Sequence, residues 1–475
     1  MKLKYFILIP MLAAAVMGCK KQLDLVPQQS VKDEMVFSTP SNAFAAVMGL
    51  YSTAQALDFY GNMPQIIEEY MGNNVEFVGT FPTLQDINTF SAVSTNSNVS
   101  ALWQAHYQVI ARANKIIAKI GSVPVLDAQL QSEYIGEAKF MRALAYFQLS
   151  NLFAQPYQVS SGTNLSVPLV LEDFDPNNIL YPSRATLQVI HTQIINDLKD
   201  ATIALPVDYS SAEETRGRAT KGAAYGLLSR IYLYREQWGL SEQAVRDALA
   251  QGIYTLAPNY NFYSANSSED VFTIQNSAID NGRTGSGGWA AFYVPAASGG
   301  RGDAPFSQDL LNAYNAEPTD KRFALKVTGT ATDGLSHEFT SKFPDAVNNS
   351  DNAPVIRTTE LYLNLAEALA KQSTAVADAK AVEAINILNI RLRDRAGLGA
   401  KVVTTPAALV EAILLERRKE LAFEGHARID LLRNRKALRV GEPKAAFGAP
   451  RTILPIPQRE IDNNPGLQGQ QNADY

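Results

Sequence analysis

Apolar residues recur at helical spacing in paired segments of this chain of 475 residues. Residues 102–120 and 133–153 each place their large apolar side chains on one face of a helix. In the first segment this face holds Trp103, Tyr107, Ile110, Asn114 and Ile117. Since an amphipathic helix must bury its apolar face against another element, the two segments predict a helical hairpin.

A second pair of segments follows at 186–205 and 220–236, and a further helix is predicted at 241–252, closed by Gly252. Small residues (Ala138, Ala143 and Ala145) let neighbouring helices approach closely, as in tetratricopeptide-type repeats. The pairs are spaced more widely than the roughly 34 residues of a regular array. We therefore predict a mostly α fold, a degenerate tetratricopeptide-like helical-repeat scaffold with long loop-rich insertions and a few short strands.

The scaffold is predicted at about 41–58, 101–252 and 354–440 within one domain over 41–475. Ser41 is the expected N-cap of a helix at 42–51. Near the C-terminus, helices are predicted at 355–372, 376–395 and 406–424.

Two long segments, about 59–100 and 254–353, lack this pattern and are predicted to be variable loops. The second contains short strand-like stretches at 271–274 and 323–327. It is also rich in aromatic residues, which argues against disorder. Long ordered loops in a compact domain often carry function.

The N-terminus has the form of a bacterial lipoprotein signal. Two lysines precede an apolar stretch too short to span a bilayer, and Gly18 stands before Cys19, the only cysteine of the chain. We predict a signal peptide at 1–18, acylation of Cys19, and a lipidated tether at 19–40. The alternative is an ordinary secretory signal with a chance cysteine.

Composition excludes several classes of function. A net charge of −5 without a basic block gives no footprint for nucleic acid. Without cysteines beyond Cys19, disulfides and cysteine-based zinc sites are excluded, and the four scattered histidines form no metal motif. No nucleophile elbow or phosphate loop is present. We expect no metal, no cofactor and no catalytic residues.

Ordered motifs along the chain resemble the SusD/RagB family of cell-surface nutrient-binding lipoproteins. The N-terminal matches are Cys19 with Leu23–Pro27, and Trp103 with Tyr107 and Asn114. The C-terminal matches are Pro354–Arg357, Glu360–Ala368, Ile385–Arg391, Arg395–Gly397, Glu416–His426, Asp430–Arg433 and Leu454–Pro457.

The segment 416–424 carries Glu416, Glu420 and Glu424 at i, i+4 spacing, which is repulsive unless cations intervene. We predict a structural ionic network in which Arg417, Arg418, Arg428 or Arg433 neutralise these carboxylates. Acid–base catalysis by paired carboxylates is the alternative.

A sugar-binding site needs aromatic faces for stacking and polar groups for hydroxyls. Both loop segments offer them, and family members likewise bind ligand through these regions. The candidate ligand residues are Asn73, Asn74, Phe77, Phe81, Trp289, Phe292, Tyr293, Arg301 and Asp303. For Trp289 and Tyr293 the alternative is packing under the loop, and Asn73 and Asn74 could instead cap a turn.

The resemblance implies a non-catalytic lipoprotein, exposed on the outer membrane, that captures an oligosaccharide for a SusC-like TonB-dependent transporter. Three alternatives stay open: the same receptor role for peptides, a lipid-anchored glycan hydrolase, and a helical scaffold without a small ligand.

Overall fold

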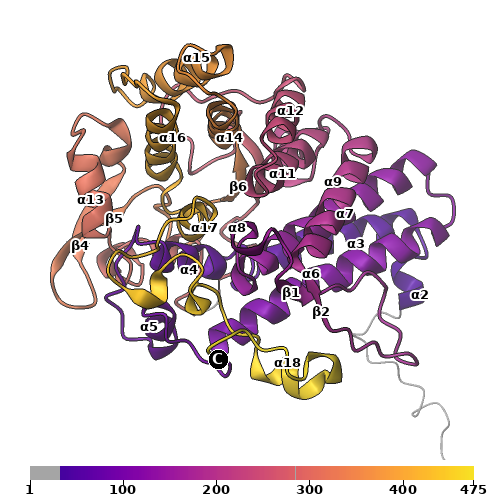
Figure 1. The fold of residues 1–475 in the computed structure, drawn as a ribbon. Coiled ribbons are helices and arrows are strands. Elements are labelled where there is room, and N and C mark those ends of the chain that lie inside the picture. Colours follow the sequence, from indigo (N-terminus) through magenta and orange to yellow (C-terminus); the bar gives the residue numbers. More distant parts are fainter. Residues whose placement is uncertain (1–32, 284) are drawn as a thin grey trace, which may run out of the picture.

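The computed structural model describes residues 33–283 and 285–475 (Figure 1). The predicted signal peptide, Cys19 and most of the predicted tether lie outside these residues. Within them, no helix combines the length and the apolar character needed to cross a bilayer.

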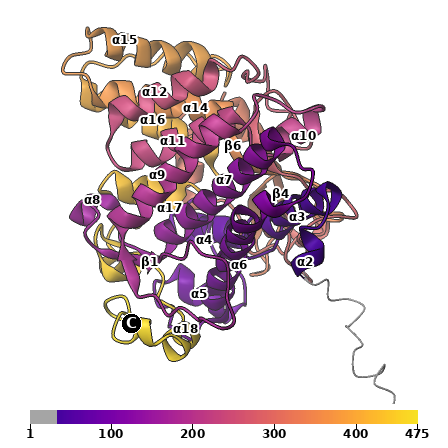
Figure 2. The same cartoon turned by 90° about the vertical axis from the view of Figure 1, so that its right-hand side faces the viewer.

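A continuous array of helices forms the scaffold, each packing on the next along the series (Figures 1 and 2). The array consists of α3 (Pro40–Ala54), α6 (Ser97–Lys119), α7 (Ala128–Phe153), α9 (Leu187–Ala204), α11 (Lys221–Tyr234), α12 (Trp238–Leu249), α14 (Thr358–Lys371) and α16 (Pro406–Leu421). The mostly α prediction is confirmed: the α6–α7 and α9–α11 hairpins overlap the predicted segments, although α6 and α7 each begin five residues before their predicted starts.

Helix starts follow capping chemistry. The Thr186 and Thr220 side chains accept hydrogen bonds from the backbone N–H of Val189 and Ala223, so these threonines begin α9 and α11. The predicted cap at Ser41 is wrong: Thr39 caps α3, and Pro40 occupies the first turn. A four-residue helix, α2 (Asp33–Val36), precedes it inside the predicted tether.

The segment 59–100 is more helical than predicted. It contains α4 (Met63–Met71) and α5 (Pro82–Asn88), and α6 begins at Ser97. Every residue of α4, including Glu68 and Glu69, is buried. Gln65, Glu68 and Glu69 recur at helical spacing, but nine residues are too few for this period alone to predict a helix.

Three two-stranded antiparallel sheets complete the described fold. They pair β1 (Leu165–Pro168) with β2 (Arg184–Thr186), β3 (Asp270–Ile274) with β6 (Ala353–Arg357), and β4 (Lys326–Thr330) with β5 (Ser336–Thr340). The strand predicted at 271–274 is confirmed. The helix predicted from residue 355 is wrong at its start, because β6 runs to Arg357 and α14 begins only at Thr358. Residues 321–324 form a 3₁₀ turn, so the strand predicted at 323–327 begins at Lys326.

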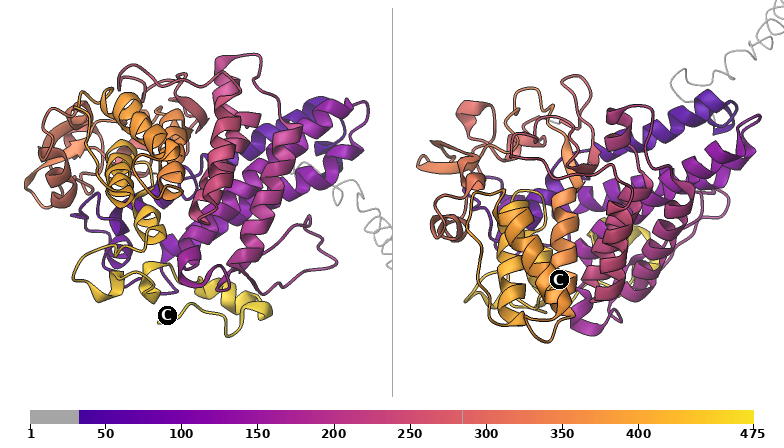
Figure 3. Two further views of the ribbon diagram at one scale, coloured as in Figure 1. Left: turned by 45° about the horizontal axis from the view of Figure 1, so that its top comes forward. Right: turned by 90° about the horizontal axis from the view of Figure 1, so that it is seen from above.

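The remaining helices lie at the margins of the array: α8 (Tyr157–Ser160), α10 (Ala212–Gly217), α13 (Gln308–Asn315), α15 (Ala379–Asn386), α17 (Ala427–Arg433) and α18 (Gln458–Asn463). A π-helical stretch, Ile387–Arg393, continues α15. In two further views most of the 254–353 segment lies beside the C-terminal helices of the array, and the N-terminal helices extend to the other side (Figure 3).

A buried ionic cluster joins these two parts. The Glu420 carboxylate lies 2.7 Å from Arg395 and 3.1 Å from Arg322, and these cations, with Arg357, hold its pKa at about 2 against the effect of burial. Glu424 pairs with Lys342 at 2.9 Å and Arg357 at 2.8 Å. The predicted network is confirmed.

Its predicted partners are wrong. The four arginines named from the sequence pair with other acids: Arg417 with Asp430, Arg418 with Asp309, Arg428 with Glu68, and Arg433 with Glu367. The cations around Glu416, Glu420 and Glu424 come instead from distant segments, which adjacency along one helix could not reveal.

Candidate functional site

Three of the predicted ligand aromatics lie inside the protein. Trp289 is 2% exposed, and Phe292 and Tyr293 are fully buried. The Trp289 ring meets Phe343 edge-on at 5.1 Å between centroids, and Asn62 Nδ2 donates a 2.6 Å hydrogen bond to the Trp289 carbonyl. These three rings contact other protein groups and not solvent, so in this structure they pack under the loop.

Phe81, Arg301 and Asp303 are brought together where the two loop segments meet, with only Phe81 well exposed. The Arg301 guanidinium lies between the rings of Phe81 and Phe292, 4.3 and 4.5 Å from their centroids, and pairs with Asp303 at 2.7 Å. Phe81 is 47% exposed. We call Phe81, Phe292, Arg301 and Asp303 the Phe81–Arg301 stack; it combines an accessible ring with a largely buried guanidinium fixed by cation–π contacts and an ion pair.

Phe77 supports this region from below. It is nearly buried, and its ring contacts Tyr70 edge-on at 5.1 Å. The backbone N–H of Val78 donates to the Asp303 carbonyl at 3.1 Å, which ties the two loop segments together.

Asn73 and Asn74 serve other partners. Arg418 donates to Asn74 Oδ1 at 2.8 Å and to the Asn73 carbonyl at 3.0 Å. Asn74 Nδ2 donates to Glu69 at 2.7 Å. These asparagines close the end of α4 against α16, Asn74 through its side chain and Asn73 through its backbone carbonyl.

A cavity of about 640 Å³ opens between the end of α3, α10 and the segments 264–280 and 350–352. Its lining is rich in amides and hydroxyls: Ser52, Gln55, Ser264, Asn266, Gln275, Asn276, Ser277, Ser350 and Asn352. Met48 and Tyr51 give it an apolar wall, and Glu213, Glu214, Arg218 and Asp280 add charge. We call this cavity the amide groove.

The amides of the groove hold one another in place. Asn266 and Gln275 exchange hydrogen bonds of 2.8 and 3.0 Å, and Asn352 Nδ2 donates to Asn266 Oδ1 at 2.9 Å. Asn276 Nδ2 donates to the Asp351 carbonyl at 3.0 Å, whereas its Oδ1 has no hydrogen-bond partner within the described structure. This oxygen is buried in the wall of the groove, and a buried acceptor without a partner is suited to a ligand hydroxyl that reaches it when the neighbouring side chains shift.

Most residues that line the amide groove were not predicted from the sequence. The segment from Ser264 to Asn281 is rich in Asn, Gln and Ser, which was the available signal. Only the tertiary fold brings this segment together with Gln55 and Asn352. Among the described residues, no group of His, Cys, Asp and Glu is arranged to hold a metal ion.

Comparison with known proteins finds family profiles that match two parts of the chain. A family profile described as "Starch-binding associating with outer membrane" matches residues 23–233, and the profile of the SusD family matches residues 307–475. The chain belongs to the SusD/RagB family.

Its relatives align over almost their full lengths. A SusD-like protein P25 from Formosa agariphila is 26% identical over 98% of both chains. A crystallised SusD superfamily protein from Bacteroides thetaiotaomicron is 28% identical and superposes with a TM-score of 0.79, covering 91% of this chain and 99% of the other. A laminarin-binding SusD-like protein shares the fold, with 24% identity, a TM-score of 0.74 and coverage of 92% and 100%.

Proposed function

We propose that this protein is a non-catalytic lipoprotein of the outer membrane surface that captures an oligosaccharide and passes it to a SusC-like TonB-dependent transporter. Family membership supports a role in carbohydrate binding, and a neighbour in fold carries laminarin binding in its name. The observation that carries the proposal to this chain is the amide groove, whose lining offers donors and acceptors for hydroxyls.

In this proposal, sugar hydroxyls bind along the amide groove, with Asn276 Oδ1 as one acceptor. The Phe81–Arg301 stack is a second contact area, where a sugar ring would cover the exposed part of Phe81 and Arg301, anchored by the buried Asp303, would meet its hydroxyls. Trp289, Phe292 and Tyr293 then support the loops from beneath. Membrane attachment through Cys19 remains part of the proposal.

Isothermal titration calorimetry tests ligand class and site together. The protein is titrated with plant, fungal and host oligosaccharides and with a peptide digest. We expect saturable heat with one glycan class, and about tenfold weaker binding for Asn276→Ala, since an unmade hydrogen bond in a shielded groove costs roughly 1 kcal/mol or more. Asn196→Ala, an exposed change on α9 outside the groove, is the matched control.

Phe81→Ala examines the stack in the same titration, with Phe174→Ala as its control because Phe174 is also exposed but lies in the β1–β2 connection. Loss of stacking typically weakens binding by 1 kcal/mol or more, roughly fivefold. Binding of peptides alone would replace the glycan proposal by the peptide alternative. Unchanged glycan affinity in both Asn276→Ala and Phe81→Ala would reject the proposed contact areas.

The transporter partnership has its own test. We expect a large β-barrel protein to co-purify with the lipidated chain from detergent-solubilised outer membranes, and to be lost when Cys19→Ser prevents acylation. A chain that fractionates alone from its native membrane would contradict this part of the proposal.

A further inference from the structure

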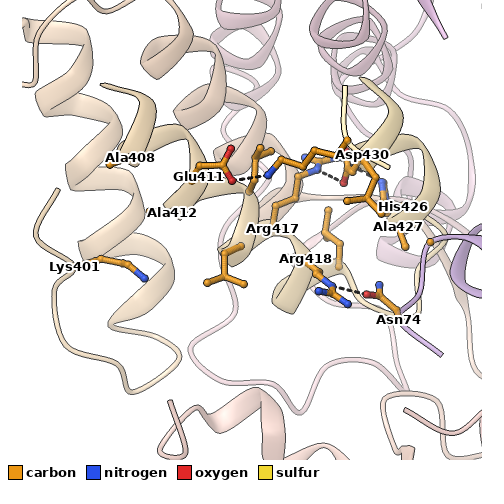
Figure 4. Close-up of a pocket in the computed structure, with 16 residues that line it drawn as sticks. Asn74, Lys401, Ala408, Glu411, Ala412, Arg417, Arg418, His426, Ala427 and Asp430 are labelled. Atoms are coloured by element: carbon orange, nitrogen blue, oxygen red, sulfur yellow. Dashed lines mark hydrogen bonds and ion pairs between the residues drawn. The ribbon is translucent and has the colours of Figure 1, made fainter. Parts of the chain in front are cut away.

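A second cavity lies between α16, α17 and the loop before α16, with Asn74 and Arg418 at one of its sides (Figure 4). It encloses about 490 Å³, within the range of small-molecule sites. Half of its lining residues form an apolar wall: Gly72, Ala408, Ala412, Leu414, Leu415, Leu421, Ala427 and Leu431. It shares no lining residue with the amide groove.

Charged groups surround this apolar wall, and cations outnumber acids among them. Lys401, Arg417, Arg418 and Lys436 face Glu411 and Asp430. Three of the cations are neutralised by acids: Arg417 by Asp430, Arg418 by Asp309 and Lys436 by Glu411.

Lys401 differs from these. Its backbone is fixed, because its N–H donates to Asn389 Oδ1 at 2.8 Å and its carbonyl accepts from Asn389 Nδ2 at 3.2 Å. Its ammonium forms no ion pair or hydrogen bond within the described part of the chain. Figure 4 shows the Lys401 side chain on one side of the cavity, with Arg418 and Asn74 across from it.

A cavity with an apolar wall and one unneutralised, half-buried cation is complementary to a molecule with an apolar body and a single negative charge. We propose that this cavity binds a small amphipathic carboxylate, with its apolar part against Ala408, Ala412 and Leu415 and its carboxylate at Lys401. The carboxylate could belong to a free organic acid or to the C-terminal residue of a short peptide. This site is separate from the proposed glycan contacts, so either proposal can fail alone.

The test uses ligand-observed NMR titrations on the full chain in detergent, with 4-phenylbutyrate and N-acetyl-L-phenylalanine as probes and the corresponding amides as uncharged comparators. Ala408→Trp fills the mouth of the cavity from an exposed position of α16. Ala407→Trp, the exposed neighbour that does not line the cavity, is the matched control and also reports partition into detergent. Lys401→Gln removes the charge, and Lys199→Gln controls for it on the exposed surface of α9.

We expect at least one acid to bind saturably, several-fold tighter than its amide. Ala408→Trp should abolish this binding and Ala407→Trp should not. Lys401→Gln should weaken the acid about fivefold, as expected for one half-buried charge pair, and leave the amide unchanged. Preference for 4-phenylbutyrate would assign the site to free organic acids, and preference for N-acetyl-L-phenylalanine to peptide C-termini.

Three results would overturn the proposal: no saturable binding of either acid up to about 10 mM, equal affinity for acid and amide, or acid binding that Ala408→Trp leaves intact. Because both tryptophan variants lie in the first turn of α16, a thermal melt of each distinguishes a filled cavity from a failure to fold.

Discussion

At the scale of single residues, the buried charges around α16 must all be paired, because an unpaired charge in the protein interior is costly. The Glu420 carboxylate is 1% exposed and paired with arginines from three separate segments. Removing one partner of a buried charge pair is costly, since the remaining charges stay desolvated. This arrangement links the 254–353 segment to the helical array in addition to backbone hydrogen bonds such as that from the Thr358 N–H to the Glu269 carbonyl.

We predict that Glu420→Gln lowers the free energy of unfolding by about 3 kcal/mol, because Arg322 and Arg395 lose their shared counter-charge. Chemical denaturation measures the change. Glu383→Gln, which breaks the surface pair with Arg246, should stay within about 0.5 kcal/mol of the parent. Equal losses of unfolding free energy for the two substitutions would show that the buried cluster contributes no more to stability than a surface ion pair.

His191 predicts a pH dependence. Its ring nitrogens are buried without hydrogen-bond partners, and burial, assisted by Arg235, lowers its pKa to about 3. The unfolded chain takes up a proton below about pH 6.5 while the folded chain does not, so this histidine costs stability progressively as the pH falls from 6.5 toward 3.

His191→Phe removes the titrating group and keeps the stacking on Tyr157. Its stability relative to the parent should therefore rise by about 2 kcal/mol between pH 7 and pH 5. Denaturant titrations at the two pH values provide the measurement, and His337→Phe, at a partly exposed histidine paired with Asp333, is the control. A pH-independent difference for His191→Phe would contradict the assignment of a neutral buried ring.

At the scale of elements, the contact between α4 and α17 depends on the absence of a side chain at Gly72. A Cβ at this position would lie 2.4 Å from Ala427 Cβ and 2.5 Å from the Arg428 nitrogen. Gly72→Ala should therefore push the two helices apart and cost about 1–3 kcal/mol. Gly121→Ala, where a Cβ meets nothing within 4 Å, is the control, and thermal melts compare the two. An unchanged melting temperature for Gly72→Ala would mean that α17 is free to shift.

The elements that could be predicted from the sequence were the long ones. Helices α6, α7, α9 and α11 span 14 to 26 residues, so apolar residues recur at helical spacing over several turns. Helix α4 spans nine residues and strand β6 spans five, which is too short for the period alone to define them, and β6 was wrongly joined to the helix that follows it.

At the scale of the whole molecule, tertiary packing limited how much of the site could be predicted from the sequence. The aromatic richness of the 254–353 segment was correctly interpreted as order, but the tertiary fold places Trp289 and Tyr293 inside the protein. The amide groove joins Gln55, Asn276 and Asn352, which are far apart in sequence. Their convergence follows from the β3–β6 pairing and the packing of α3, and neither was visible in local patterns.

The central claim is that this protein binds a glycan and does not cleave it. The most direct measurement is equilibrium titration of the intact protein with an oligosaccharide panel, followed by chromatography of the recovered ligand. We predict saturable binding of one glycan class, weakened by Asn276→Ala, with the ligand recovered at its original length. Shortened ligand, or saturable binding of peptides in place of every glycan, would contradict the account.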